Sequence, residues 1–253
     1  MKSSLTDVFG PDVVDEIFGI VGSVPDITFT KEELVRAQEL GQDLIFFVKE
    51  NESGPLTLKA MYSKHMYSIG YSGLRLNLNW HREDRFFNEA VPVSGWALVS
   101  RSVLRGSINR NYVEETQAIV DYLVDEVYQG LKMPEAYKRV IAEFKFYKQE
   151  LIELIRENTQ ESIEECNRRC TALKVNQLFR ERPVEVFYGL TLWVKVNNRR
   201  LLRGWHTRTN TCTDDGRIVE CGCYSDPHSW RVACSESKNA RPRLGTRFIR
   251  RPS

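Results

Sequence analysis

The stretch GWHTRTNTCTDDGRIVECGCYSDPHSWRVACSESKNARPRLGTRFIRRPS, residues 204–253, decides the fold class of this chain. Turn-forming residues recur in it, and no part of it has the apolar spacing of a helix. Three short β-prone segments lie between the turns, at 217–221, 230–234 and 246–250. We therefore expect strands and loops throughout this region, with the last strand paired in a sheet.

The same region contains the candidate binding residues. Large aromatic side chains stand there beside Ser, Asp, His and Arg, a composition typical of binding surfaces built on loops. The predicted ligand-binding residues are Trp205, His206, Glu220, Cys223, Tyr224, Asp226, His228, Ser229, Trp230, Arg231, Glu236 and Lys238. Because aromatic residues dominate the affinity of many interfaces, we expect Trp205, Tyr224 and Trp230 to be the anchors. The alternative is that one or both tryptophans lie in the core and support the framework instead of contacting a ligand.

Other positions in the region are expected to hold the backbone. These framework positions are Gly222, Val232, Leu244, Gly245 and Phe248. Polar positions such as Glu220 and Arg231 are expected instead to be exposed and to tolerate substitution, as surface residues usually do.

Residues 1–203 are predicted to form a body that contains both strands and helices. Short apolar runs at 44–48 and Gly95–Ser100 indicate buried strands. A helical insert is predicted at about 111–198, where Asn111 and Glu114 have the spacing of a capping box.

Two prolines mark the first turns of later helices in this insert. Pro134 begins one that runs to Asn158, and Pro183 begins the last. Between them, another helix is predicted from about Gln160, with an apolar stripe that runs from Ile163 to Gln177. The whole chain is therefore predicted to be one α+β domain, a body of strands and helices followed by the 204–253 region.

The charge of the chain is unevenly distributed. The net charge of the 253 residues is +2, but residues 199–253 contain twelve Lys and Arg against five Asp and Glu. One interpretation is that this basic region contacts nucleic acid or an acidic partner. The other is that its positive charge only offsets the negative charge of residues 1–198. For nucleic acid, the residues expected to track phosphates are Arg241, Arg243, Arg247, Arg250 and Arg251.

The sequence has the ordinary composition of a soluble globular protein, with 42% hydrophobic and 28% charged residues. Residues 1–10 lack the apolar run of a signal peptide, and no apolar stretch approaches the ~18 residues of a membrane span. We therefore expect a cytoplasmic protein whose six cysteines are free thiols.

Cysteine chemistry is the main alternative to recognition. Cys166 and Cys170 have the spacing of a chelating pair on a helix, but they also continue an apolar stripe, which predicts core thiols. The other four cysteines lack the paired spacing of structural zinc sites. A nucleophile at Cys221 or Cys223, with His206 or His228 as base, is the enzymatic alternative. We predict no cofactor, no metal and no catalytic activity.

Two stretches carry a resemblance to a known family. In the first, residues 214–224 (DDGRIVECGCY), framework positions alternate with idiosyncratic ones. The second, residues 244–250 (LGTRFIR), is similar to the terminal strand of C-type-lectin-type domains. The segments 29–47 and 95–129 are similar to the body found with such tails. The chain thus resembles the variable proteins of diversity-generating retroelements. It departs from them at Thr246, where the family usually has Phe, and in its cysteine-rich tail.

The resemblance implies a C-type-lectin-like fold of short antiparallel strands with packed helices, shared with formylglycine-generating-enzyme-like domains. In that family a reverse transcriptase copies a template repeat with substitutions at adenines, which diversifies a C-terminal ligand-binding surface. The expected function is therefore non-catalytic recognition of a macromolecule, with a protein as the preferred partner and nucleic acid as the alternative.

Overall fold

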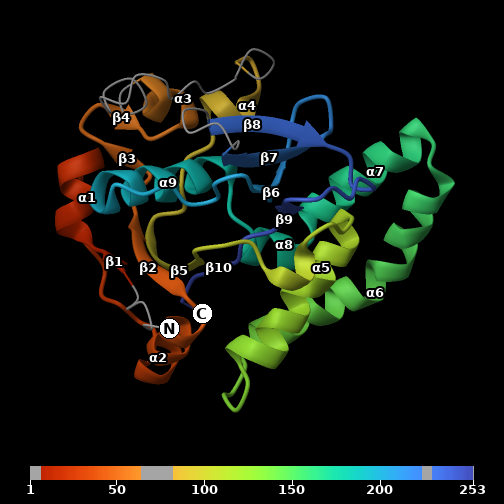
Figure 1. Cartoon of the computed structure of the whole chain (residues 1–253), viewed down its shortest axis with the longest axis horizontal. Helices are drawn as coiled ribbons and strands as arrows, with labels where there is room; N and C mark the ends of the chain where they lie inside the picture. Colours follow the sequence, from red (N-terminus) through yellow and green to blue (C-terminus); the bar gives the residue numbers. More distant parts are fainter. Residues whose placement is uncertain (1–6, 64–81, 224–229, 253) are drawn as a thin grey trace.

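The computed structural model describes residues 7–63, 82–223 and 230–252 (Figure 1). It has the α+β class that the sequence predicts. The helices are α1 (Pro11–Phe18), α2 (Lys31–Glu39), α3 (Leu58–Met61), α4 (Arg85–Asn88), η2 (Arg105–Ser107), α5 (Tyr112–Asp121), η3 (Tyr122–Val127), α6 (Glu135–Glu157), α7 (Gln160–Ala172), α8 (Lys174–Phe179) and α9 (Pro183–Asn197). The strands are β1 (Val8–Phe9), β2 (Gln42–Phe47), β3 (Glu50–Asn51), β4 (Gly54–Pro55), β5 (Gly95–Ser100), β6 (His206–Cys212), β7 (Ile218–Cys223), β8 (Trp230–Ser235), β9 (Leu244–Gly245) and β10 (Ile249–Arg250).

One four-stranded sheet, which we call sheet A, joins the two ends of the chain in the order β1-β2-β5-β10. The two predicted apolar strands form its centre, where β2 pairs antiparallel with β5 from Gln42↔Ser100 to Phe47↔Gly95. β10 pairs antiparallel with β5, and β1 pairs parallel with β2. The prediction that the last strand belongs to a sheet is therefore confirmed.

The second four-stranded sheet, sheet C, is built from the 204–253 region in the order β8-β7-β6-β9. Its strands β7 and β8 lie where the sequence predicts them, whereas β6 was not predicted. The predicted strand at 246–250 is shorter than expected, because only Ile249–Arg250 form β10, which pairs with β5, while the preceding Leu244–Gly245 form β9, which pairs with β6. The segment between β9 and β10 bonds to the body through Leu104 N to Thr246 O (2.8 Å) and Ser100 N to Phe248 O (2.9 Å).

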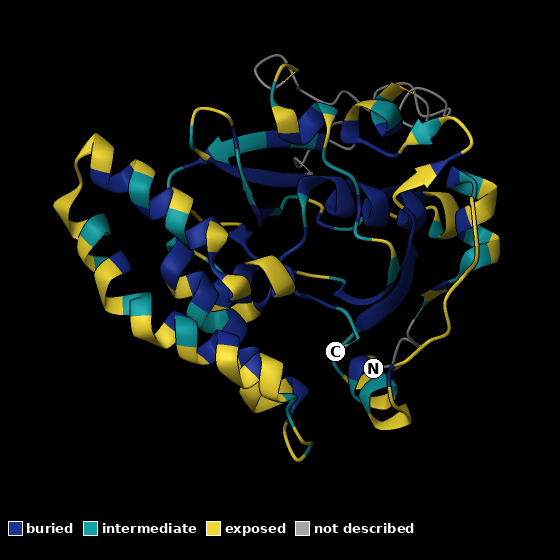
Figure 2. Ribbon diagram, turned by 180° about the vertical axis from the view of Figure 1, so that it is seen from behind, coloured by how far each residue is buried: buried dark blue, intermediate teal, exposed yellow. Residues whose placement is uncertain are grey.

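Helix α9 lies between the two sheets and is buried along most of its length (Figure 2). Its Tyr188 ring packs on Phe18 and Phe47, and the Tyr188 hydroxyl donates to Phe46 O at 3.1 Å. On its other side, Phe187 contacts Trp230 of β8. Although it closes the predicted helical insert, α9 thus belongs to the apolar core that both sheets share.

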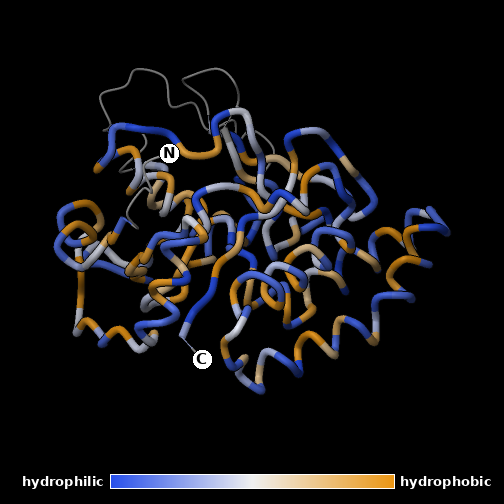
Figure 3. The backbone as a smooth tube through the Cα atoms, turned by 60° about the horizontal axis from the view of Figure 1, so that its bottom comes forward, coloured by the Kyte–Doolittle hydropathy of each residue, from blue (hydrophilic) through white to orange (hydrophobic). Residues whose placement is uncertain are grey.

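Helices α5 to α8 enclose a second apolar cluster. The capping box at Asn111 is formed by both of its hydrogen bonds, and α6 ends at Asn158 in the left-handed conformation. The predicted helix from Ile163 to Gln177 is wrong in one respect, because it breaks at Leu173 into α7 and α8. Helices α6 and α7 project from the body, and hydrophobic and hydrophilic residues alternate along both (Figure 3).

Candidate functional site

Three of the predicted ligand-binding residues meet at one end of sheet C, which we call the 206 end. His206 is the first residue of β6 and pairs with Gly222 of β7, which in turn pairs with Arg231 of β8. Trp205 directly precedes His206. The side chains of Trp205, His206 and Arg231 are all half-buried. The sheet therefore brings His206 and Arg231, which are distant in sequence, close together at its partly exposed end, and the half-buried Trp205 beside them also packs against the apolar core.

A close backbone approach fixes the geometry of the 206 end. A Cβ atom at Gly222 would lie 2.2 Å from the carbonyl oxygen of Trp205, so no other residue fits there without a shift of the backbone. The Trp205 N–H donates to Leu202 O at 2.9 Å and closes the turn before β6. The predicted framework role of Gly222 thus has a steric cause.

Arginines that were not in the predicted site also belong to this end of the sheet. His206 N donates to Arg243 O at 2.9 Å, which brings the exposed side chains of Arg241 and Arg243 beside β6. Arg203, also exposed, lies in the turn that precedes Trp205. The 206 end is therefore a partly aromatic surface with a basic rim.

The electrostatics of the 206 end favour a neutral imidazole. Burial lowers the pKa of His206; Glu220 opposes this effect, and the positive charges of Arg231 and Arg241 lower the pKa further. A neutral imidazole has one donor and one acceptor nitrogen, which suits it to hydrogen bonding with a ligand.

The prediction that Glu220 is exposed is wrong. Only 2% of this residue is exposed, and its carboxylate lies 3.7 Å from Arg208 Nε and 3.8 Å from Arg241 Nη1. Because successive side chains alternate along a strand, Glu220 shares its face of β7 with Ile218, which is buried. Glu220 therefore supports the sheet from inside instead of facing a ligand.

Trp230 is also a framework residue, as the alternative interpretation of the tryptophans allowed. It is 1% exposed, and its ring centroid lies 5.7 Å from that of Phe187 in α9. The predicted framework residues Val232, Leu244 and Phe248 are buried as well. Of the two tryptophans in the described part of the binding region, Trp205 remains at the surface.

The remaining predicted residues do not join the 206 end. Glu236 and Lys238 follow the far end of β8, where Lys238 Nζ donates to Asn158 Oδ1 at 2.7 Å. At ~3.3 Å per residue, that end of β8 is on the order of 13 Å from Arg231. Tyr224, Asp226, His228 and Ser229, with the side chain of Cys223, lie outside the described residues.

Some of the arginines predicted to contact phosphates are buried in ion pairs, and others are exposed. Arg247 and Arg250 are 1% exposed, so the prediction that they contact a polyanion is wrong. Arg247 Nη1 lies 3.3 Å from Glu181, Arg250 pairs with Glu33, and Arg251 pairs with Glu185. Arg241 and Arg243, in contrast, are exposed at the 206 end.

The structure bears on the cysteine-based alternative at Cys221, since the Cys223 side chain and His228 lie outside the described residues. Cys221 is fully buried, and burial raises the pKa of its thiol well above the usual value, which disfavours the nucleophilic thiolate. Cys166 and Cys170 are fully buried in the apolar cluster, the position expected of core thiols. Within the described segments, no three His, Cys, Asp or Glu side chains are grouped so that they could hold a metal ion.

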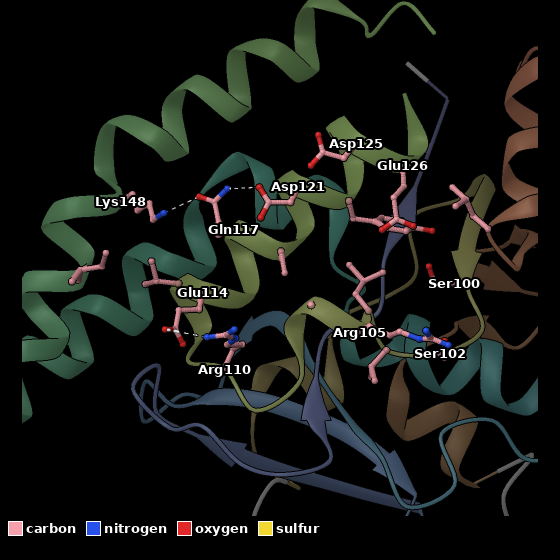
Figure 4. Close-up of a pocket in the computed structure, with 18 residues that line it drawn as sticks. Ser100, Ser102, Arg105, Arg110, Glu114, Gln117, Asp121, Asp125, Glu126 and Lys148 are labelled. Carbon is pink, nitrogen blue, oxygen red and sulfur yellow. Dashed lines mark hydrogen bonds and ion pairs between the residues drawn. The ribbon is translucent and has the colours of Figure 1, made fainter. Parts of the chain in front are cut away.

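A separate cleft of about 510 Å³ lies between η2, α5, η3 and α6 (Figure 4). The neutral Gln117 links two of its charged side chains, since Lys148 Nζ donates to Gln117 Oε1 at 2.9 Å and Gln117 Nε2 donates to Asp121 Oδ1 at 2.6 Å. Arg110 and Glu114 form a longer pair at 4.0 Å. None of the predicted ligand-binding residues lines this cleft, and no motif in the sequence indicated it.

Comparisons with known proteins give no further assignment. No helix in the described part of the chain is both long and apolar enough to cross a membrane. No protein-family model, no curated protein and no solved structure matches the chain.

Proposed function

We propose that this chain is a ligand-binding display protein with a C-type-lectin-like fold, of the kind diversified by retroelements, and that it recognises a macromolecule at the 206 end without catalysis. The observation that carries the proposal is the contrast at that end. Trp205, His206 and Arg231 are partly exposed, while Gly222 beneath them has no room for a side chain. Variable side chains on a fixed backbone need this combination.

The fold part of the proposal is supported by the arrangement of the strands. The resemblance implies that the C-terminal strand lies in the sheet that holds the N-terminal strands, and β10 lies in sheet A with β1 and β2. It also implies short antiparallel strands, and β6, β7 and β8 are antiparallel neighbours in sheet C.

A protein is the preferred partner. Aromatic residues and arginine are enriched at the centres of protein interfaces, and the 206 end combines Trp205 with Arg231. The burial of Arg247 and Arg250 leaves fewer exposed cations for a polyanion. Nucleic acid therefore remains the alternative, restricted to Arg203, Arg241 and Arg243.

Randomisation of the described surface tests the proposal. A display library varied at Trp205, His206 and Arg231 is selected against a panel of proteins, beside a control library varied at Gln149, Glu153 and Arg156, exposed residues of α6. We expect specific binders from the first library and none from the second, with unchanged thermal melts in both. Equal yields from the two libraries, or loss of folding in the first, would overturn it.

The origin of the diversity has its own test. A near-copy of the codons for residues 204–250, differing at template adenines and lying beside a reverse transcriptase gene, is expected in the neighbouring DNA. Binding to single-stranded DNA that falls steeply with salt and is lost in an R241A/R243A variant would favour the nucleic-acid alternative.

A further inference from the structure

Two buried thiols form a pair that the recognition function does not use. Cys166 and Cys170 are one turn apart on α7, and their Sγ atoms lie 3.7 Å apart. Neither residue has any exposed surface. The pair lies where α7 packs on α6, since Cys166 Sγ is also 3.7 Å from Leu151 O.

A third polar group points to a ligand at this place. Apart from its contact with the Cys166 thiol, the fully buried Ser237 hydroxyl has no hydrogen-bond partner within the described part of the chain. Its backbone is held firmly, because Ser237 N donates to Asn167 Oδ1 at 2.7 Å and Ser237 O accepts from Tyr112 N at 2.8 Å. Because a thiol is a weak hydrogen-bonding group, the lone pairs of this buried hydroxyl are available to a further ligand.

The geometry of the pair suits a metal ion better than a disulfide. Side chains four apart on a helix have Cβ atoms ~5–6 Å apart, whereas a disulfide requires ~3.5–4.5 Å, so oxidation would distort α7. Two thiolates 3.7 Å apart, each bonded at ~2.3 Å to one ion, subtend an angle of about 107° at that ion. An ion therefore fits between the sulfur atoms while the helix stays intact.

We propose that Cys166 and Cys170 bind one soft d¹⁰ ion of the Cu(I) class, with the Ser237 oxygen as a third, weaker ligand. Zinc sites usually have four ligands, whereas soft thiolates select Cu(I), which accepts fewer. The ion replaces the two thiol protons, which pass to the solvent, and no oxidant or reductant is needed. The apoprotein is folded without it, because the same residues pack as small hydrophobic side chains.

Access to the pair depends on the turn that follows β8. Glu236 and Lys238 pair at 3.2 Å, and Lys238 also bonds to Asn158 at the α6–α7 junction. These partly exposed contacts are worth little individually, so the turn that carries Ser237 is expected to open often enough for an ion to enter.

The test is uptake of Cu(I) by the full reduced chain under anaerobic conditions. Cu(I) is supplied as its bicinchoninate complex, whose visible absorbance falls as the protein removes the ion. We expect one Cu(I) per chain, uptake weakened at least tenfold in C166S and in C170S, and a smaller loss in S237A. Variants C221S and C234S, which lack another buried thiol and a partly exposed thiol, are expected to match the wild type.

A second measurement keeps the proposal testable if C166S or C170S does not fold. X-ray absorption of the wild-type chain loaded with Cu(I) is expected to show two sulfur neighbours and one lighter neighbour. No uptake by the wild type, undiminished uptake in a folded C166S or C170S chain, or a coordination shell without two sulfur atoms would overturn the assignment.

Discussion

The two four-stranded sheets of this protein are buried with different chemistry. All six residues of β2 in sheet A are buried, and after Gln42 and Asp43 they are apolar. In β6 of sheet C the buried run is Thr207, Arg208, Thr209 and Asn210. Sheet A is therefore stabilised mainly by the hydrophobic effect, whereas sheet C combines apolar residues of β7 and β8 with a β6 strand whose buried polar groups must find partners.

A buried charge network explains how sheet C tolerates this composition. Glu115 of α5, itself fully buried, contacts Arg180 Nη1 at 2.9 Å and Arg208 Nη1 at 3.1 Å. Arg180 also stacks over the Tyr112 ring at 3.9 Å and bonds to Asn176 Oδ1. A buried charge is costly unless it is paired and hydrogen-bonded, so each partner in this network supports the others.

The largest expected effect comes from the one segment that belongs to both sheets. Deletion of residues 244–253 removes β9 from sheet C, β10 from sheet A, and Phe248, which is fully buried against Tyr122 and Phe179. We expect loss of cooperative folding, because the ladder bonds and core contacts disappear together. The measurement is far-ultraviolet circular dichroism during heating.

A cooperative melt of the truncated chain near the parent temperature would contradict the shared role of this segment. It would also count against the C-type-lectin-like fold, in which the terminal strand is integral. Deletion of Pro252 and Ser253 alone is the control and should leave the melt unchanged.

The second prediction compares the two chemistries directly. Glu115→Ala leaves Arg180 and Arg208 without their carboxylate, and breaking a buried pair in this way typically costs about 3–5 kcal/mol. Leu98→Ala in sheet A should cost about 2–5 kcal/mol through the cavity that it leaves. Urea unfolding measures both, with exposed Glu126→Ala as the control. An unchanged free energy of unfolding in E115A would show that the network is not stabilising.

The difference between apolar and polar buried residues also explains which helices and strands could be predicted from the sequence. Apolar runs and capping residues locate β2, β5, α5, α6 and α9, because burial of apolar surface leaves a periodic pattern. β6 has no such pattern, since its buried side chains are polar. The burial of Glu220 and Arg247 could not be foreseen either, because a charged residue is assigned to the surface unless its buried partner is known.

The candidate site was predictable to a similar degree. Composition located the binding region, and the steric role of Gly222 agrees with its prediction as framework. The separation of Glu236 and Lys238 from the 206 end follows from strand register, which long-range pairing sets. Arg203, Arg241 and Arg243 were missed as site residues because their proximity to His206 arises from backbone pairing between distant segments.

The third prediction concerns pH. Burial raises the pKa of Glu181 from 4.5 to about 7, although Arg247 opposes this shift. Because the folded chain then binds this proton more tightly than the unfolded chain, the contribution of Glu181 to stability is greatest below pH 4.5 and falls as the pH rises to about 7.

The expected size is on the order of 3 kcal/mol, from about 1.4 kcal/mol per pKa unit. Glu181→Gln removes the titration, so the difference in unfolding free energy between wild type and E181Q should change by this amount between pH 4.5 and 7.5. Glu153→Gln, at an exposed position, should give a difference that is independent of pH. A constant difference for E181Q as well would mean that the buried pair stays ionised throughout.

The smallest expected effect separates display positions from the framework of sheet C. Arg231 and Glu220 lie on neighbouring strands, but Arg231 is half-buried at the 206 end and Glu220 is enclosed between Arg208 and Arg241. Arg231→Ala should change the free energy of unfolding by no more than about 0.5 kcal/mol, as surface substitutions usually do. Glu220→Ala should cost about 1–3 kcal/mol, because Arg208 and its neighbours lose a buried acceptor. Phe248→Ala, at about 3–5 kcal/mol, gives the upper reference for a framework residue. Urea unfolding of the three variants measures these losses in the free energy of unfolding. If R231A loses as much stability as F248A, the 206 end is not a display surface, because variation there would destroy the fold that presents it.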